Sequence, residues 1–153
     1  MKILISYFYQ IRFFPRNYIP ISTAAFDPKW FHPRDNKKGV FEHQKTGVIY
    51  GIRMEEFSPM GIDCDCKKDC EHDPKTCAFL SDYEEWLNSK LNFKECIKNI
   101  EYTAMKYNAT GDEPIAVLIV YETPDNPCSE RVKLVKWFKE NGYELDEFDK
   151  NKI

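Results

Sequence analysis

The chain has 153 residues, 42% hydrophobic and 31% charged, and its 22 basic and 25 acidic side chains give a net charge of −3. This length suits one compact domain with a full core and leaves little room for a second. The near balance of charge excludes a global attraction to nucleic acid or anionic membranes but leaves a local basic patch open. No window approaches the roughly 20 apolar residues that cross a bilayer.

The N-terminal third predicts strands joined by loops. Residues 1–8 are apolar but too few for a signal peptide core, and no small-residue cleavage site follows, so they indicate a buried first strand. We therefore expect an intracellular, cytoplasmic protein. Residues 18–23 and 46–53 are β-branched and aromatic, which favours a second and a third strand, and residues 24–33 form an aromatic, proline-rich loop.

The C-terminal half predicts helices alternating with strands. Apolar residues recur at helical spacing over 79–91 and again over 93–107, and the run 115–121 is typical of a strand buried on both faces. Asn126 is a candidate N-cap with Pro127 at the first helical position of a helix to residue 141, and a last strand follows over 143–148. This order is a βαβ unit.

These elements predict an α/β fold: a single Rossmann-like domain with a mostly parallel sheet flanked by helices. The domain covers residues 1–148, with a cysteine-rich loop inserted at 62–78, and residues 149–153 form a frayed tail. The chain contains no Gly-rich phosphate loop, no dinucleotide fingerprint, no His-Glu metalloprotease helix and no nucleophile elbow. The absence of these motifs leaves open whether the protein is an enzyme.

The cysteine-rich loop is the candidate metal site. Four thiols, those of Cys64, Cys66, Cys70 and Cys77, fall within fourteen residues, and His72 could replace one of them. Such a set suits a tetrahedral zinc ion, and a reducing compartment favours metal or redox chemistry over structural disulfides. An iron–sulfur cluster is a weaker alternative because the spacing matches neither common ferredoxin pattern. Redox-active thiols without a metal are the third interpretation.

The segment that follows the central strand is the candidate catalytic site. If the predicted capping holds, Cys128 lies in the first turn of a helix, where amide groups and the helix dipole favour an anion and lower the pKa of a thiol. Cys128 could then be a nucleophile, Glu122 an acid–base group and Arg131 a stabiliser of negative charge, with Ser129 beside them. The alternative is a buried cysteine, a capping serine and a surface ion pair.

Three further residues are candidates for ligand binding. Ser22 and Arg53 end predicted strands, where open α/β sheets bind ligands, and Trp30 could stack on a base. Trp30 could equally pack within its loop. We therefore expect a small anionic, nucleotide-like ligand at the carboxyl ends of the strands. The alternative function is a non-catalytic interaction module, phage or host-defence related, that uses the cysteine loop and the aromatic segment 26–31.

Several sequence blocks resemble the uncharacterised domain-of-unknown-function family numbered 488, in its bacterial and phage form. The blocks are residues 6–8, 20–22 with 28–31, 50–53, 77–80 with Tyr83 and Leu87, and 121–124 with 128–131. The resemblance implies an α/β fold with a pocket and supplies no reaction. Members of that family often carry Cys-His-Arg near the position of Cys128, whereas Ser129 and Glu130 precede Arg131 here. No role for that histidine can be carried over.

Overall fold

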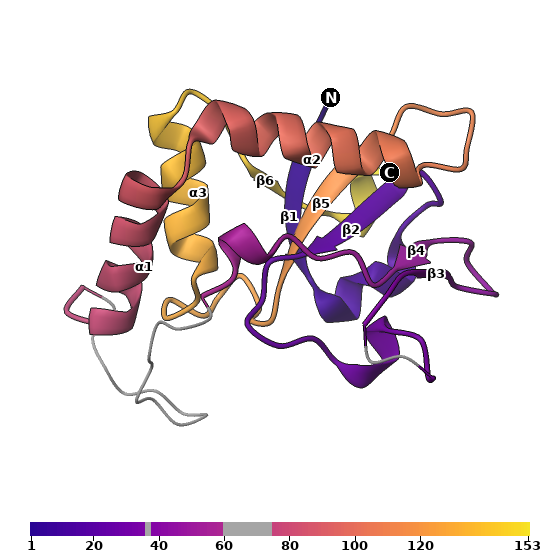
Figure 1. Ribbon diagram of the computed structural model, residues 1–153, viewed down its shortest axis with the longest axis horizontal. Helices are drawn as coiled ribbons and strands as arrows, with labels where there is room; N and C mark the ends of the chain where they lie inside the picture. The colour runs from indigo at the N-terminus through magenta and orange to yellow at the C-terminus, as the bar shows by residue number, and fades with distance from the viewer. Residues whose placement is uncertain (36–37, 60–74) are drawn as a thin grey trace.

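The computed structural model describes residues 1–35, 38–59 and 75–153, and it has an α/β fold built on a four-stranded parallel sheet (Figure 1). The strand order is β2 (Tyr18–Ser22), β5 (Ile115–Val120), β1 (Ile3–Tyr7) and β6 (Asp146–Glu147). The central strand β5 pairs with β1 on one side and β2 on the other. Every residue of β5 after Ile115 is buried, because both faces of the sheet are covered.

Three helices pack on one face of the sheet: α1 (Ala78–Lys90), α2 (Phe93–Tyr107) and α3 (Arg131–Glu140). Asn92 begins α2 as its N-cap, where its side chain accepts a hydrogen bond of 3.1 Å from the Glu95 amide. The helices and strands share one apolar core. It includes Ile5, Ile21, Leu118, Tyr83, Leu87, Ile100, Leu134 and Phe138.

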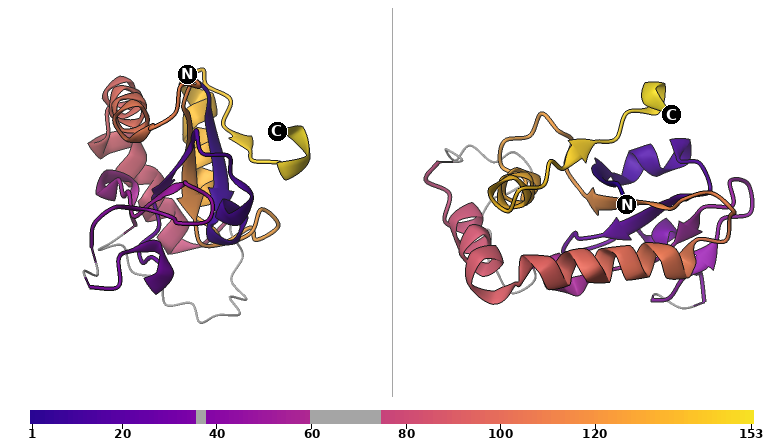
Figure 2. Two further views of the ribbon diagram at one scale, coloured as in Figure 1. Left: turned by 90° about the vertical axis from the view of Figure 1, so that its right-hand side faces the viewer. Right: turned by 90° about the horizontal axis from the view of Figure 1, so that it is seen from above.

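Short elements instead of long helices cover the opposite face. They are η1 (Phe8–Phe13), η2 (Lys29–Phe31) and a hairpin of β3 (Phe41–Glu42) with β4 (Ile49–Tyr50). Figure 2 shows α2 and η1 on opposite sides of the strands. A second core of Leu4, Phe8, Ile11, Phe31, Tyr50, Val117 and Ile119 fills this side. Two further short helices are η3 (Glu55–Phe57) and η4 (Lys150–Lys152), the latter within the predicted tail.

The predicted strands 1–8, 18–23 and 115–121 and both predicted helices before residue 108 are confirmed within two residues at each end. The third predicted strand shrinks to Ile49–Tyr50, and the last one to Asp146–Glu147. Residues 62–74 of the predicted cysteine-rich loop, which spans 62–78, lie outside the described part of the chain. Among the helices of that described part, none has the length and apolar character needed to cross a membrane.

The predicted start of the last helix is wrong by four residues. The helix α3 begins at Arg131, and residues 127–130 form turns. The Asn126 side chain does accept a hydrogen bond of 2.9 Å, but from the Cys128 amide two residues later. That local geometry is an Asx turn, which competes with helix formation. Cys128 therefore precedes the helix and does not lie in its first turn.

Candidate functional site

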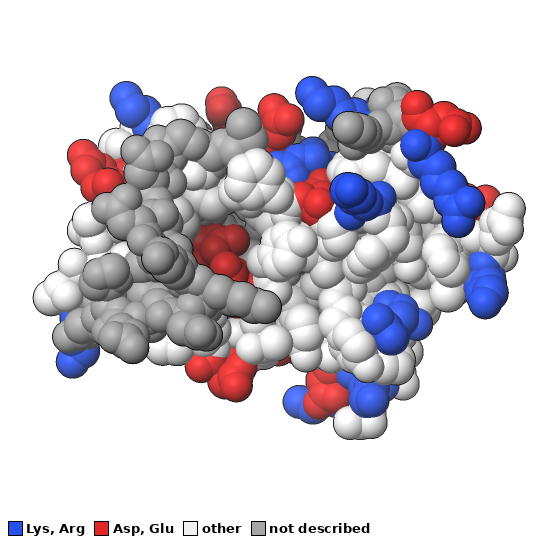
Figure 3. Space-filling model, turned by 90° about the horizontal axis from the view of Figure 1, so that it is seen from below, with Lys and Arg blue, Asp and Glu red and all other residues white. Residues whose placement is uncertain are grey.

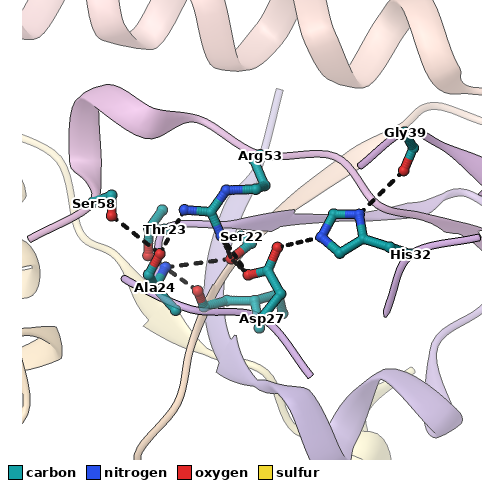
Figure 4. Close-up of polar contacts among 9 residues, drawn as sticks. Ser22, Thr23, Ala24, Asp27, His32, Gly39, Arg53 and Ser58 are labelled. Carbon is teal, nitrogen blue, oxygen red and sulfur yellow. Dashed lines mark hydrogen bonds and ion pairs between the residues drawn. The ribbon is translucent and has the colours of Figure 1, made fainter. Parts of the chain in front are cut away.

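Four polar side chains meet where β2 ends, and we call them the Asp27 network: Ser22, Asp27, His32 and Arg53 (Figure 4). The backbone brings Arg53 to this place. The Ser22 amide donates to the Ile52 carbonyl at 2.9 Å, and the Met54 amide donates to the Ser22 carbonyl at 3.0 Å. This parallel bridge extends the pairing of β2 by one step and aligns Arg53 with the last residue of the strand.

Asp27 is the centre of the network. Its carboxylate accepts hydrogen bonds from Ser22 Oγ at 2.5 Å, Arg53 Nη1 at 2.5 Å and His32 Nε2 at 2.7 Å. Only 3% of the Asp27 side chain is exposed. Arg53 also donates through Nη2 to the Ala24 carbonyl at 2.8 Å. A buried carboxylate with this many donors holds the arginine and the histidine in fixed positions.

An open groove of about 650 Å³ lies beside this network. Asp27, His32 and Arg53 form part of its wall, and the last two turns of α2 form another part. The groove brings together basic and aromatic side chains from segments far apart in the sequence. These are Phe26, His32, Lys38, Arg53, Tyr102, Lys106 and Tyr107. Tyr102 and Lys106 are exposed, so a ligand in solution can reach them directly.

A second group of polar side chains lies between the end of β5 and the start of α3, and we call it the Arg131 cluster: Glu122, Ser129, Glu130, Arg131 and Glu147. Ser129 Oγ donates to the Glu122 carboxylate at 3.0 Å and accepts from the Arg131 amide at 3.1 Å. The Arg131 guanidinium pairs with the Glu147 carboxylate and donates to the Glu122 carbonyl at 3.0 Å. Arg131 Nε is buried and has no hydrogen-bond partner among the described residues.

Glu130 is the most perturbed acid of the Arg131 cluster. Burial raises its pKa to about 8, and the charge of Glu122 and a hydrogen bond with that side chain contribute in the same direction. Burial also raises the pKa of Glu147 to about 6, although Arg131 opposes this shift. A carboxyl group that holds its proton near neutral pH can donate it, which is the property of a general acid.

The structure divides the predicted site residues between two places. Ser22 and Arg53 belong to the Asp27 network, whereas Glu122, Ser129 and Arg131 belong to the Arg131 cluster. No hydrogen bond or ion pair joins the two groups within the described ranges 1–35, 38–59 and 75–153. Cys128 is half-buried and lies in the turn before Ser129. Trp30 does not line the groove but packs against Phe8 and Tyr50.

The predicted metal site lies mostly outside the residues that the structure covers. Cys64, Cys66, Cys70 and His72 fall within 60–74. Cys77 is described: it is buried and occupies the N-cap position of α1. The described residues contain no group of three or more His, Cys, Asp or Glu side chains that could hold a metal ion. Zinc and the iron–sulfur alternative therefore stay predictions.

Sequence reasoning missed Asp27, Lys106 and Glu130. Asp27 and His32 are five residues apart in a loop whose aromatic residues drew attention to packing and stacking. Lys106 follows the apolar stripe of α2 and carries no local sign of a groove. Glu130 has one signal, because a Glu beside Arg131 and eight residues after Glu122 can form a carboxyl pair when the connecting loop is short.

In the comparison with known proteins, no family model, no curated protein and no solved structure matches the chain. The resemblance to the family numbered 488 therefore rests on its sequence blocks alone and stays a prediction. The site has to be interpreted from its own geometry.

Proposed function

We propose that the protein binds a small anionic, nucleotide-like ligand in the groove beside Arg53. The observation that carries this proposal is a groove of about 650 Å³ whose wall includes Lys38, Arg53 and Lys106. Small-molecule sites typically have volumes of about 300–1,000 Å³, so the groove has room for a nucleotide. The groove begins where β2 ends, and the carboxyl ends of parallel strands are the usual place for ligands in Rossmann-like sheets.

The charge of the groove supports an anionic ligand. Its wall holds Lys38, Arg53 and Lys106 against the carboxylates of Asp27 and Glu55, which is a net of +1 without the histidine. Asp27 is paired with Arg53 at 2.5 Å, which leaves Lys38 and Lys106 against Glu55 as the other charges of the wall. An anionic group held near Lys106 and Arg53 gains from both charges.

Aromatic side chains support a ligand with a flat ring. The side chains of Phe26 and Tyr102 are 77% and 68% exposed, and both line the groove. Exposed aromatic rings stack on nucleobases at about 1–3 kcal/mol per base. A phosphate near the cations and a base on Phe26 or Tyr102 would use both features of the wall.

The Arg131 cluster does not enter this proposal as a source of turnover. None of Glu122, Cys128 and Arg131 lines the groove. The catalytic roles predicted for these three residues would require a substrate outside the groove. The proposed function is therefore binding. Ser22 is fully buried and acts by holding Asp27, which in turn holds Arg53.

Calorimetric titration with a nucleoside monophosphate, the corresponding nucleoside and inorganic phosphate tests the proposal. Wild-type protein should bind the monophosphate more tightly than either part. Lys106→Glu should weaken this binding by about tenfold or more, since it reverses a charge in the wall. Lys98→Glu is the matched control because Lys98 is an exposed residue of the same helix and does not line the groove. No saturable binding, or equal affinity of both variants, would overturn the proposal.

The predicted zinc ion is a separate part of the proposal. Cys77 at the start of α1 would let an ion bound by Cys64, Cys66 and Cys70 attach the loop to the helix. Elemental analysis of protein purified without chelators should find about one zinc per chain. Protein without metal would remove this interpretation and leave the ligand groove unaffected.

A further inference from the structure

The charges of this chain are separated along the sequence. Residues 1–54 carry nine Lys and Arg against three Asp and Glu, a net of +6, while residues 55–153 carry thirteen against twenty-two, a net of −9. The overall charge of −3 hides this separation. Charge asymmetry between parts of a chain is a common sign of a surface that meets a polyanion.

The N-terminal stretch exposes basic side chains and almost no acidic ones. Within residues 1–34 the only acidic side chain is Asp27, and just 3% of it is exposed. The basic side chains Arg12, Lys29 and Arg34 of the same stretch are exposed, and so is Arg16, which pairs with Glu42 at 3.4 Å. In Figure 3 the Lys and Arg side chains lie mostly in one half of the face seen from below, together with a few Asp and Glu side chains.

Two of these basic side chains lie beside exposed aromatic rings: Arg12 lies over Tyr9, and Lys29 precedes Trp30 in η2. Phe8 contacts Trp30 at a ring-centroid distance of 6.1 Å and Tyr121 at 5.3 Å, so these two rings flank it. Trp30 is 48% exposed and Tyr121 is 52% exposed. Tyr9, the next residue after Phe8 in η1, is 53% exposed. We call Tyr9, Arg12, Lys29, Trp30 and Tyr121 the aromatic surface.

Two cationic side chains, those of Arg12 and Lys150, lie over aromatic rings in this region. The Arg12 guanidinium carbon lies 3.8 Å from the centre of the Tyr9 ring, and Lys150 Nζ lies 4.4 Å from the centre of the Phe13 ring. Tyr9 and Phe13 are themselves in contact, with ring centroids 6.2 Å apart. Alternating rings and cations are the combination that binds unpaired bases together with their phosphates.

We propose that the aromatic surface binds single-stranded nucleic acid. Bases stack on Trp30, Tyr121 and Tyr9, while Arg12 and Lys29 contact the phosphates between them. None of the five residues of the aromatic surface lines the groove. The proposal is therefore independent of the small-ligand function. Stacking requires unpaired bases, so duplex DNA binds more weakly at the same salt concentration.

Fluorescence anisotropy with a labelled oligothymidylate of about 15 nucleotides tests the proposal. Wild-type protein should bind the strand, and the affinity should fall steeply between about 50 and 200 mM salt as phosphate counterions are released. Arg12→Glu and Lys29→Glu should each weaken binding by about fivefold or more without loss of fold, because both side chains are exposed. Tyr121→Ala removes a stacking ring and should weaken binding by a similar factor.

A matched control makes the test specific. Lys98→Glu makes the same charge change on α2 and should bind the strand as wild type does. If Arg12→Glu and Lys29→Glu bound the strand with the same affinity as the wild-type protein, the proposal would be overturned. Equal or tighter binding of duplex DNA would overturn it as well, and so would binding of polyglutamate in place of the oligonucleotide, since neither needs stacked bases.

Discussion

Arg53 and Asp27 lie 26 residues apart in the chain and form an ion pair of 2.5 Å whose carboxylate is almost completely buried. Asp27→Asn keeps the shape of the side chain but leaves Arg53 and His32 without their carboxylate. We expect the free energy of unfolding to fall by about 3 kcal/mol, since removing one partner of a buried pair leaves an uncompensated charge. Urea denaturation followed by circular dichroism measures this change.

The control for this prediction is Glu113→Gln, which removes an exposed carboxylate whose side chain makes no hydrogen bond or ion pair with any described residue. It should leave stability within about 0.5 kcal/mol of wild type. An Asp27→Asn variant as stable as this control would mean that the network contributes little to folding.

Gly51 should not tolerate a side chain. Its φ is +100°, and a Cβ there would lie 2.0 Å from the Gly39 carbonyl oxygen. Gly51→Ala should lower the free energy of unfolding by at least about 2 kcal/mol, because backbone strain and a collision with the main chain add together. Gly111→Ala is the matched substitution, since nothing lies within 4 Å of its Cβ position, and it should be neutral in the same denaturation experiment. Equal stability of the two variants would contradict the prediction.

The fold was predictable where burial alone decides it. The run Ile115–Val120 forms the central strand because six apolar residues in a row fit only a position covered on both faces. The start of α3 was not predictable, because Asn126 can cap either a helix or a turn, and the choice depends on Ser129 Oγ bonding to the Arg131 amide and to Glu122. A local sequence does not contain that tertiary contact.

The site was predictable only as separate residues. Ser22 and Arg53 were chosen because they end predicted strands, and the structure does place them side by side. Asp27, which joins them, comes from a loop whose path follows from packing of Phe31 against Phe8 and Tyr50. Spacing along the chain cannot show which loop carboxylate turns back under an arginine.

The thiols of Cys96 and Cys128 should differ in reactivity. Cys96 is 3% exposed in the core beside Ile100, and burial followed by the charges of Glu56 and Glu95 raises its pKa to about 12. Cys128 is half-buried. Iodoacetamide should therefore alkylate Cys128 in the native protein and Cys96 only after denaturation, which peptide mass spectrometry resolves. Modification of Cys96 in folded protein at the rate of Cys128 would contradict its place in the core.

The buried Glu130 should make the protein less stable as the pH rises. Its pKa is about 8 when folded, against about 4.3 for an unperturbed Glu, so the folded state binds this proton more tightly than the unfolded chain does. The stabilising contribution is complete below about pH 4.3 and is lost as the pH rises to about 8, with a slope of at most about 1.4 kcal/mol per pH unit. Glu147, whose pKa is raised to about 6, adds to the loss over the lower part of this range.

Glu130→Gln cannot ionise, so its stability should change less between about pH 6 and pH 8 in urea denaturation. The exposed Glu144→Gln should follow wild type, and a Glu130→Gln variant with the wild-type slope would show that Glu130 does not hold a proton in the folded protein.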